Sequence, residues 1–446
     1  MAELEMEIPE EFKETEIGLV PMDWKVVRLG DVVLKTKQTD PKKKPNWYFK
    51  YIDVSSISSG NLRVCGYLEY QGKDAPSRAK KLIKKGDVLF ATVRPYLKRI
   101  AQIPSELDGH ICSTAFCVIR GTLEIADSTF LYFITSTDNF VERVTAHQRG
   151  SSYPAVTDKD VLKELIPLPP LSEQRKIAHV LSLIQRAIEL QDKVTAAVRE
   201  LKKSLMRHLF TYGPVSVDQV GRVALKETEI GPVPEHWEVV RLGDVAVVKG
   251  STTSPTSLGN CNEKGSNNIR LLYLKVSDMN LPGNDYMIVN SKEVLYINSK
   301  KIEEISLVPP SALIFPKRGA AICTNKKRLT STYCLLDPNL LAVIPHEIQH
   351  LYLYYWFQGF DLLSIVDNSP IPQLNRKDVE PIQIPLPTTG EQQQISGILD
   401  FVDKKLMTEE KRKSTLQSLF QTMLHLLMTA QVRVKDLEVT VGETGF

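Results

Sequence analysis

The sequence predicts a mixed α/β (α+β) fold in which two similar globular domains are joined by two long helices that form an antiparallel coiled coil. Three observations predict this fold: a segment written twice near the start of each half, a second repeated segment near the end of each half, and a long apolar stripe of helical period after each second segment. The chain has 446 residues, enough for two or three domains. The expected architecture is therefore an internal repeat with pseudo-twofold symmetry.

The duplication is clearest at the two ends of each half. Residues 13–32 (KETEIGLVPMDWKVVRLGDV) and 226–245 (KETEIGPVPEHWEVVRLGDV) are identical at sixteen of twenty positions. Residues 151–174 and 369–392 match in the same order, with pairs such as Pro154/Pro372, Asp160/Asp378 and Glu173/Glu391. Two ordered matches at nearly one offset indicate a tandem duplication. Trp24 and Trp237 occupy matched positions, and we expect both to pack in the core of their domain.

The repeat divides the chain into seven segments. We expect an acidic tail at 1–16, a first domain at 17–170, a long helix at 171–212, a linker at 213–229, a second domain at 230–389, a second long helix at 390–431 and a C-terminal tail at 432–446. Between the matched ends the halves diverge. Residues 51–62, 86–93, 271–280 and 311–318 predict strands and turns, and residues 131–144 and 351–366 predict helices. Two domains with matching ends and different middle segments suit a protein whose domains act on two different targets.

The two long helices carry the same seam pattern. The first is expected to begin at an N-cap, Ser172, and to stop at Gly213 and Pro214; the second is expected from about 390 to 430. Steps of four and three residues give a stripe of Ile177, Leu181, Ile184, Ile188, Gln191, Thr195, Val198, Lys202, Leu205 and Leu209 in the first helix, and of Ile395, Leu399, Val402, Leu406, Glu409, Lys413, Leu416, Phe420, Met423 and Leu427 in the second. Such a stripe is typical of a coiled coil, and antiparallel pairing would set the two polar centres against each other. The alternative is two amphipathic helices that each pack on their own domain.

Several function classes lack their motifs. The sequence contains no GxxxxGK[ST], GxGxxG, [DNS]PP[YFW] or GxSxG, which argues against a nucleotide-driven motor, a dinucleotide enzyme, an amino-methyltransferase and a serine hydrolase. Residues 346–350 (HEIQH) have the HExxH spacing, as a single short match. Cys112 and Cys117 lie in apolar stretches, typical of core residues rather than metal ligands. The six cysteines form no CxxC, no apolar run approaches a membrane span, and the start is acidic. We therefore expect a non-catalytic, metal-free chain with reduced thiols in the cytoplasm.

The charge is distributed unevenly along the chain. The formal net charge is only +3, but residues 1–16 hold seven acids and one base, residues 73–99 hold nine bases and two acids, and residues 317–328 hold five bases and no acid. Basic clusters of this kind suit a polyanionic partner. Each run taken alone is equally consistent with solvated surface charge.

These features together resemble a known family. The opening IG-x-VP-x-x-W-x-VVRLGDV in each half, the GDVLFATVRPYL stretch at 86–97, the LPPLSEQRKIA junction at 168–178 and the long helix after each half resemble the specificity (S) subunit of type I restriction-modification systems, the HsdS family. The resemblance follows the family's order of parts over nearly the whole chain. One departure is the second junction, LPTTGEQQQISGIL, in which Gly397 marks either close packing or a contact with another subunit.

The resemblance implies a function and a set of partners. It implies two target recognition domains, each of which binds one half of a bipartite, asymmetric double-stranded DNA target, and helices that set the half-site spacing. It also implies two methyltransferase (M) subunits that use S-adenosylmethionine and restriction (R) subunits that use ATP and Mg, whereas this chain binds no cofactor and has no catalytic residue. Residues 173–176 and 391–394, at the helix starts, are the expected M-subunit contacts.

Candidate DNA contacts follow from the basic clusters, because forked side chains read bases and cations bind phosphate. In the first domain they are Arg78, Lys80, Lys81, Arg94, Lys98 and Arg99, and in the second Lys275, Lys317, Arg318, Asn325, Lys326, Lys327 and Arg328. Two matched loops are expected to touch the DNA backbone through Arg149, Ser151 and Tyr153 in the first domain and Asn375 and Arg376 in the second. The alternative function is a scaffold that presents two binding domains to peptide or RNA, which the pI of about 8.3 permits; a stand-alone nuclease or methyltransferase is disfavoured by the missing motifs.

Overall fold

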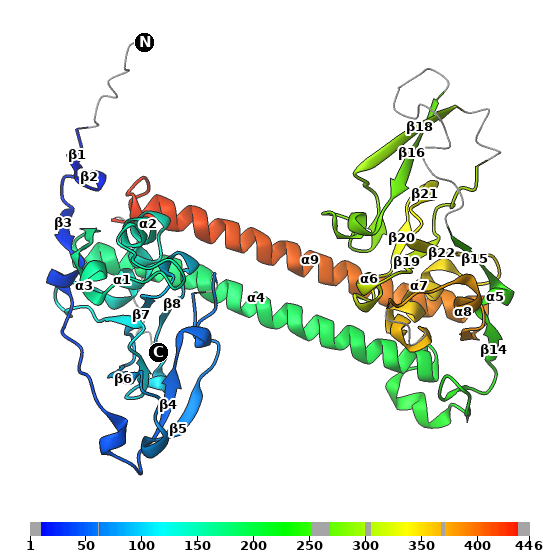
Figure 1. The fold of residues 1–446 in the computed structure, drawn as a ribbon, viewed down its shortest axis with the longest axis horizontal. Helices are drawn as coiled ribbons and strands as arrows, with labels where there is room; N and C mark the ends of the chain where they lie inside the picture. Colours follow the sequence, from blue (N-terminus) through cyan, green and yellow to red (C-terminus); the bar gives the residue numbers. More distant parts are fainter. Residues whose placement is uncertain (1–9, 61, 251–267, 299–304, 367–370, 436–446) are drawn as a thin grey trace. The chain divides into compact units, whose positions relative to one another are not determined.

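In the computed structural model, residues 10–60, 62–250, 268–298, 305–366 and 371–435 are described, and the chain forms two compact units (Figure 1). Unit 1 comprises Met1–Asp192 and Lys411–Phe446, and unit 2 comprises Lys193–Glu410. Each unit therefore contains one of the two repeated domains together with a part of each long helix.

Unit 1 contains eleven named strands and three short helices, and it holds the start of the first long helix. The strands are β1 (Phe12–Thr15), β2 (Gly18–Pro21), β3 (Lys25–Arg28), β4 (Tyr48–Ile52), β5 (Leu68–Gln71), β6 (Ala79–Leu82), β7 (Val88–Ala91), β8 (Ile100–Gln102), β9 (Ile111–Ser113), β10 (Phe116–Ile119) and β11 (Leu165–Leu168). The helices are α1 (Ser128–Thr135), α2 (Asp138–Ala146), α3 (Asp158–Lys163) and α4 (Leu171–Tyr212), which continues into unit 2.

Unit 2 has a corresponding set of elements. The strands are β12 (Leu225–Lys226), β13 (Val233–Pro234), β14 (Glu238–Arg241), β15 (Ala246–Gly250), β16 (Asn268–Leu274), β17 (Met287–Ile288), β18 (Glu293–Asn298), β19 (Leu313–Pro316), β20 (Arg328–Thr330), β21 (Cys334–Leu336), β22 (Leu340–Pro345) and β23 (Gln383–Leu386). The helices are α5 (Leu242–Val245), α6 (Ala320–Cys323), α7 (His350–Gly359), α8 (Arg376–Val379) and α9 (Thr389–Met428), whose last part belongs to unit 1.

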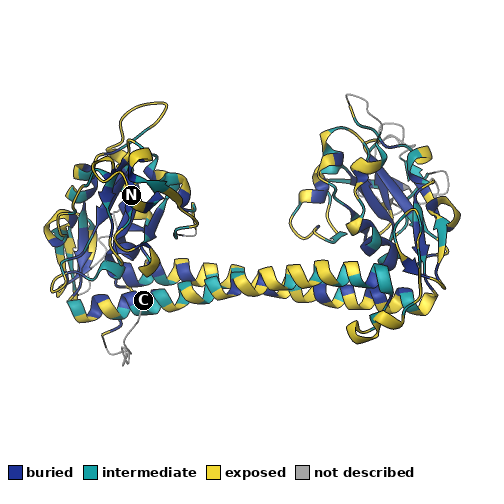
Figure 2. Cartoon of the chain, turned by 90° about the horizontal axis from the view of Figure 1, so that it is seen from below, coloured by how far each residue is buried: buried dark blue, intermediate teal, exposed yellow. Residues whose placement is uncertain are grey.

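The two units share one strand topology, including the parts whose sequences diverge. The hairpin β1–β2 corresponds to β12–β13, and the pair β3–β11 corresponds to β14–β23. In the middle of unit 1, β4 is parallel to β9 and β7 is antiparallel to β8 and β10; in unit 2, β16 is parallel to β21 and β19 is antiparallel to β20 and β22. The duplication therefore covers the whole of each domain. Figure 2 shows that buried residues concentrate on the strands inside each unit.

Trp24 and Trp237 are both in the core, as the sequence predicts. Trp24 is 1% exposed in the main apolar cluster of unit 1, and Trp237 is fully buried in that of unit 2. Each cluster also contains residues from both long helices, such as Leu181 and Phe420 in unit 1 and Leu209 and Ile395 in unit 2. The domains are thus built onto the helices by a continuous apolar core.

Local helix boundaries differ from the expected ones for identifiable reasons. The segment at 131–144 is divided between α1 and α2 because Thr137 caps α2, with its hydroxyl accepting from the amide of Phe140. Ser172 is not the N-cap of α4: the helix begins at Leu171, and the amides of Glu173 and Gln174 donate to the carbonyl of Pro170. The helix ends at Tyr212 because Gly213 follows with φ of 81°, the left-handed conformation that terminates helices.

The helices pair within each unit. In unit 2, Arg199 and Lys202 of α4 form ion pairs with Glu410 and Asp403 of α9, each at 2.6 Å. In unit 1, Asp192 pairs with Lys413 at 2.5 Å. Since α9 numbers fall as α4 numbers rise, the pairing is antiparallel, and all twenty stripe residues are buried or half-buried. The polar members Gln191, Thr195 and Glu409 are buried with the rest.

The predicted tails are partly structured. Residues 12–15 of the acidic segment form β1, paired with β2, while residues 1–9 lie outside the described part. In the described part of the second tail, Arg433 and Lys435 contact the first domain, whereas residues 436–446 again lie outside it. No helix in the described ranges has the length and apolar character that a membrane crossing requires.

Candidate nucleic-acid interface

Each domain is fixed to its helix by a matched tryptophan–glutamate contact. Trp24 Nε1 donates to Glu173 Oε2 at 3.1 Å in unit 1, and Trp237 Nε1 donates to Glu391 Oε1 at 3.0 Å in unit 2. A buried indole N–H needs an acceptor, and the carboxylate in the first helical turn supplies one. The repeated Trp and Glu positions therefore form a joint between domain and helix.

A matched glutamine completes each joint. Gln174 Oε1 accepts from the amide of Asp127, the N-cap of α1, and Gln174 Nε2 donates to Pro169 O at 2.8 Å. In unit 2, Gln392 Oε1 accepts from the amide of Gln349, the N-cap of α7, and its Nε2 donates to Pro387 O at 2.9 Å. Both side chains are buried.

The residues of this joint were predicted to contact an M subunit, and the structure corrects that prediction for three of them. Glu173, Gln174 and Gln392 are buried inside their own domains and are not available to another subunit. Of the eight residues predicted, Arg175, Gln393 and Gln394 are exposed. The repeated Glu and Gln at the start of each long helix therefore reflect the contact between helix and domain inside the chain.

Unit 1 adds a cation to its joint from the far end of the chain. Arg433, which follows α9, donates to both carboxylate oxygens of Glu173 (2.7 and 2.8 Å) and to Asp23, and its guanidinium lies 5.5 Å from the Trp24 ring centroid. Hydrogen bonding from Arg433 lowers the pKa of Asp23 to about 2. In unit 2, His236 takes the corresponding place beside Glu391, at 2.9 Å.

Two loops meet at the edge of the central sheet in each unit. We call the residues after β7 or β19 (92–99 and 317–327) the strand loop, and the residues before α3 or α8 (149–157 and 371–375) the cap loop. In unit 1, Arg94 N donates to Pro154 O at 2.8 Å and Val156 N donates to Thr92 O at 2.9 Å. In unit 2, Gly319 N donates to Pro372 O at 2.7 Å and Leu374 N donates to Lys317 O at 2.8 Å. The same backbone ladder therefore joins the loops in both units.

The strand loops also share unusual backbone angles. Arg94 and Lys98 have φ of 50° and 48°, and Gly319 and Asn325 have φ of 65° and 50°. Left-handed residues thus flank a short helical turn in each loop, Pro95–Leu97 in unit 1 and α6 in unit 2. Strained backbone of this kind is held only where the surrounding structure fixes it, and it concentrates at functional sites.

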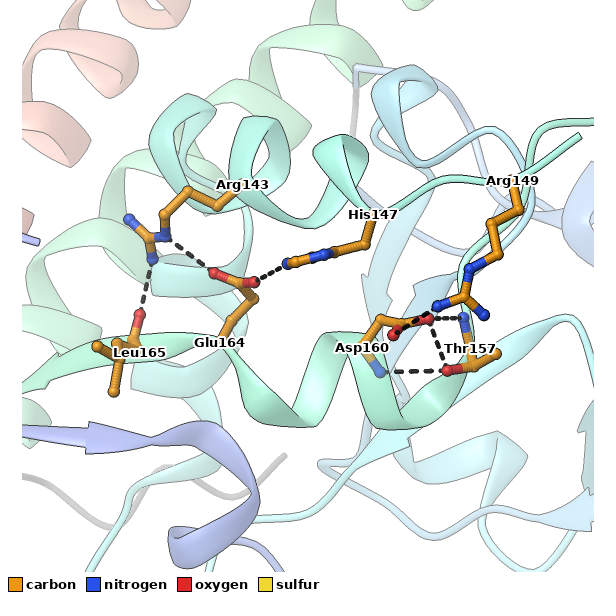
Figure 3. A network of polar contacts seen from close by, with 7 residues as sticks. All are labelled: Arg143, His147, Arg149, Thr157, Asp160, Glu164 and Leu165. Atoms are coloured by element: carbon orange, nitrogen blue, oxygen red, sulfur yellow. Dashed lines mark hydrogen bonds and ion pairs between the residues drawn. The ribbon is translucent and has the colours of Figure 1, made fainter. Parts of the chain in front are cut away.

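In unit 1 the two loops bring four of the predicted DNA contacts together. The Arg94 guanidinium lies 5.1 Å from the ring centroid of Tyr153, and its Nη2 donates to Ser152 O at 3.3 Å. Tyr153, Ser151 and Arg149 are exposed, and Arg149 reaches to 3.7 Å from Asp160 (Figure 3).

The base of this cap loop is rigid. Thr157 and Asp160 form a capping box at the start of α3, and the Thr157 hydroxyl and amide hold the pKa of Asp160 below its usual value. Figure 3 also shows Glu164 placed between Arg143 and His147, at 3.0 and 2.9 Å, which ties α3 to α2. Charged hydrogen bonds at the base of the loop therefore hold the position from which its exposed tip extends.

In unit 2 the matched loops carry different side chains. Arg318 is exposed, and its Nη2 donates to Gln373 Oε1 at 3.2 Å; Gln373 in turn donates to Asn375 Oδ1 at 3.0 Å. Arg376 is exposed and pairs with Glu380. By the backbone ladder, Arg318 occupies the position of Val93, not that of Arg94. The two units therefore present an arginine at neighbouring but different positions.

Two candidates of the first domain are not surface groups. Lys81 is 5% exposed: it pairs with Asp158 and donates to Phe116 O at 2.6 Å, so it ties β6 to the core and cannot bind DNA. Arg99 is half-buried, and its Nη1 donates to Val54 O at 2.7 Å while its Nε is enclosed. The prediction for Lys81 is wrong, because Asp158 and the core take up its charge, whereas Arg99 is half-buried and its role as a DNA contact stays a prediction.

Unit 2 contains a similar internal clamp. Lys327 is 1% exposed and donates to Asn325 Oδ1 and Phe360 O at 2.8 and 2.5 Å, and burial lowers its pKa to about 8. Asn325 also accepts from the amide of Leu362 and donates to Phe360 O. Arg328 donates to Asn284 O at 2.6 Å. These three residues hold the strand loop from within. Lys327 is too deeply buried to contact DNA, which corrects its expected role, whereas Asn325 and Arg328 are half-buried and their role as DNA contacts stays a prediction.

The remaining candidates lie in accessible or half-buried places. Arg78 is exposed. Half-buried cations with a polar partner are Lys80 (Asp40), Lys98 (Asp138), Lys275 (Glu293) and Lys326 (Asn280). Lys317 is half-buried in the strand loop. Partially exposed ion pairs of this sort contribute little to stability, so these cations remain available to phosphate.

The described residues do not assemble a metal site. No group of three or more histidine, cysteine or acidic side chains within them could hold an ion. Cys112 and Cys117 are buried in apolar clusters, where desolvation raises the pKa of both thiols. They are core residues, as the sequence predicts.

Comparison with known proteins identifies the relatives of this chain. The model of the type I restriction modification DNA specificity domain matches residues 21–200 and 234–418. The putative type I restriction enzyme MjaX specificity subunit of Methanocaldococcus jannaschii is 24% identical over 443 residues, which cover 96% of this chain and 97% of the relative. The type I restriction enzyme EcoDI specificity subunit of Escherichia coli is 21% identical and covers 96% of this chain and 94% of the relative.

Solved structures agree in fold. A chain solved to describe complex assembly and conformational transition of the type I restriction-modification system is 29% identical, with a TM-score of 0.56 over 92% of this chain and 99% of that chain. The type I restriction-modification S subunit from M. genitalium is 15% identical, with a TM-score of 0.55 over 91% of this chain and 96% of that chain; at this identity the likeness concerns the fold alone. These relatives favour a specificity subunit over a scaffold for peptide or RNA.

Proposed function

Since this chain belongs to the family of type I restriction modification DNA specificity domains and is the specificity subunit of such a system, we propose that each unit reads one half of a bipartite, asymmetric DNA target. The observation that carries the proposal is the pair of matched loops. One backbone ladder presents Arg94 and Tyr153 in unit 1 and Arg318 and Gln373 in unit 2. An identical frame with different side chains suits two half-sites of different sequence.

The contacts divide into positioning and reading. The exposed cations Arg78, Arg149 and Arg376 and the half-buried Lys98 bind phosphates, which gives a steep dependence of affinity on salt. The loop tips enter the major groove, where forked side chains distinguish base pairs.

The long helices set the distance between the half-sites. α4 has 42 residues and α9 has 40, so each is about 60 Å long at a rise of about 1.5 Å per residue. Half-sites one helical turn of DNA apart are separated by about 34–36 Å, within such a span. The ion pairs between α4 and α9 hold the two helices side by side within each unit.

Two M subunits dock on the helices. Leu183 of α4 and Phe401 of α9 occupy matched positions of the repeat and are 55% and 72% exposed. Beside Phe401, Gly397 and Ile398 line a shallow apolar groove. A Cβ on Gly397 would have no atom of the described residues within 4 Å, so this glycine is not required for packing against them. Exposed apolar side chains at two equivalent places suit two copies of one partner.

The partners supply the chemistry. The M subunits bind S-adenosylmethionine and transfer methyl groups to adenine, and the R subunits use ATP and Mg for cleavage. This chain contributes recognition and geometry. Changing Leu183 or Phe401 to Glu should each remove one M subunit, lowering the M-to-S ratio from two to one by native mass spectrometry; retention of both subunits in both variants would contradict the docking sites.

Methylation mapping tests the function directly. The chain is co-expressed with the methyltransferase subunit of its system, and N6-methyladenine is mapped by single-molecule sequencing. We expect one split, asymmetric motif that disappears when this chain is omitted. Arg94→Ala should relax one half of the motif and Arg318→Ala the other. An unchanged methylome with an active M subunit would refute the function, and equal damage to both halves would refute the assignment of one unit to each.

A further inference from the structure

Arg94 is the residue of unit 1 whose backbone and side chain are both unusual. Its φ of 50° and ψ of 59° lie in the left-handed region, whereas the matched position of unit 2 holds a glycine, Gly319, for which a positive φ causes no strain. Arg94 N donates to Pro154 O at 2.8 Å and Arg94 O accepts from Leu97 N at 3.0 Å, so the backbone is fixed on both sides. A strained arginine kept where glycine fits points to a use for its side chain.

No carboxylate among the described residues neutralises the charge of Arg94. Neighbouring cations of unit 1 have carboxylate partners: Lys80 has Asp40, Lys98 has Asp138 and Arg149 has Asp160. Among the described residues Arg94 makes no ion pair. Its interactions are with the ring of Tyr153, at 5.1 Å, and the carbonyl of Ser152, at 3.3 Å.

Stacking orients the guanidinium and leaves its edge free. A ring contact uses the face of the guanidinium, while hydrogen bonds are made in its plane, so most of its five N–H donors remain available. Tyr153 itself is 72% exposed, although aromatic side chains are usually covered, and it stands at the tip of the cap loop. Arg94 itself is half-buried, so the pair presents a planar fork at a fixed angle at the protein surface.

Such a fork matches one base in particular. Guanine offers O6 and N7 as two adjacent acceptors in the major groove, and bidentate arginine is the commonest contact to them. Phosphate also accepts the arginine fork, but such a contact does not depend on which base is present, so base analogues distinguish the two. Building on the proposed function, we infer that Arg94, held in position by Tyr153, reads a guanine in the half-site of unit 1.

Base analogues test this reading in the complete complex with M subunits. Each guanine of the mapped motif is replaced in turn by 7-deazaguanine, which lacks N7, or by inosine, which keeps O6 and N7. In the wild type, 7-deazaguanine should weaken binding by about 5- to 150-fold at one guanine of one half-site, the range that corresponds to about 1–3 kcal/mol, and inosine should not. In Arg94→Ala the 7-deazaguanine effect should vanish at that guanine alone.

Matched variants separate reading from other roles. Arg94→Lys keeps the charge without the fork and should lose the discrimination while the salt dependence is unchanged. Tyr153→Ala should lose most of the discrimination at the same guanine, and Tyr153→Phe should retain it, since the ring suffices to position Arg94. Arg149→Ala is the control and should keep the discrimination while lowering the salt slope by about one.

Three outcomes would overturn the inference. The unit 1 half-site could contain no guanine on either strand; Arg94→Ala could keep the full 7-deazaguanine effect at every guanine; or Arg94→Ala could weaken all sequences equally with a smaller salt slope, which would make Arg94 a phosphate contact. If the wild-type complex recognised no motif at all, the proposed function would fail instead, so the two failures are distinguishable.

Discussion

Substitution of Glu173 tests how the first domain is attached to α4. Glu173 is 3% exposed and receives three hydrogen bonds, one from Trp24 and two from Arg433. In Glu173→Gln an amide N–H₂ replaces one carboxylate oxygen, so a donor faces the donors of Arg433 and Trp24. The charge that balances Arg433 is lost at the same time.

The size of the effect follows from the burial of the partners. Removing one member of a fully buried ion pair costs about 3–5 kcal/mol. The Arg433 side chain is 25% exposed and keeps Asp23 as a partner, so solvent and the second carboxylate reduce the cost to about 2–3 kcal/mol. The matched Glu391→Gln should cost only about 1 kcal/mol in unit 2, because Glu391 binds Trp237 and His236 but no arginine.

Hydrogen exchange with mass spectrometry over a urea series measures each unit in the intact chain, since peptides report local opening. Glu173→Gln should lower the free energy of opening of unit 1 and leave unit 2 unchanged, while Glu391→Gln should do the converse with a smaller loss. Equal losses from the two variants, or a loss below about 0.5 kcal/mol in Glu173→Gln, would refute the role of the Arg433 pair.

Three further predictions concern the joints and the buried lysine. The pKa of Lys327 falls to about 8 in the fold, while an unfolded lysine keeps its proton to about 10.4. The unfolded chain therefore binds more protons between these values, and stability of unit 2 should rise by about 2–3 kcal/mol from pH 8 to 10.5, relative to Lys327→Met, in urea titrations; a parallel pH profile would contradict this. Asp23 has a folded pKa of about 2, so its contribution should be complete above pH 3.8 and lost as the pH falls through 2, and Asp23→Asn should flatten acid unfolding in that window. Gln174→Ala should cost about 2 kcal/mol and raise exchange at the start of α1, and Gln392→Ala should do the same at α7; unchanged exchange at either helix would show that the glutamine is not an anchor there.

The sequence predicted the features that depend on local periodicity and on repetition. The stripe from Ile177 to Leu209 requires only helical spacing, and its members are buried or half-buried in the structure. Trp24 and Trp237 could be assigned to the core because both copies of the repeat retain them. The pairing of β4 with β9 and of β16 with β21 was not predictable, because the middle segments share topology without shared sequence.

The basic segments led to some wrong DNA contacts, because a run of basic residues does not show which of them bind an acceptor elsewhere in the fold. Lys81 lies on the same face of β6 as Ala79, both of them buried, and this alternation was the available signal that it points inward. Lys327 carried no comparable signal, since one of its two acceptors, the carbonyl of Phe360, lies 33 positions away, just after α7. The pairing of Arg94 with Tyr153 joins residues 59 positions apart, and only the register of the two loops brings them together.

The joint of unit 1 also has a consequence for the order in which the protein is made. Unit 2 is one continuous stretch, Lys193–Glu410, whereas Glu173 receives its arginine from a residue 260 positions later. At ribosomal rates of about 5–20 residues per second, Glu173 leaves the ribosome roughly 10–50 s before Arg433 does. The domain translated first is therefore the last to be completed, and a nascent chain halted between Glu410 and Arg433 carries a finished second domain beside a first one whose closing residues do not yet exist.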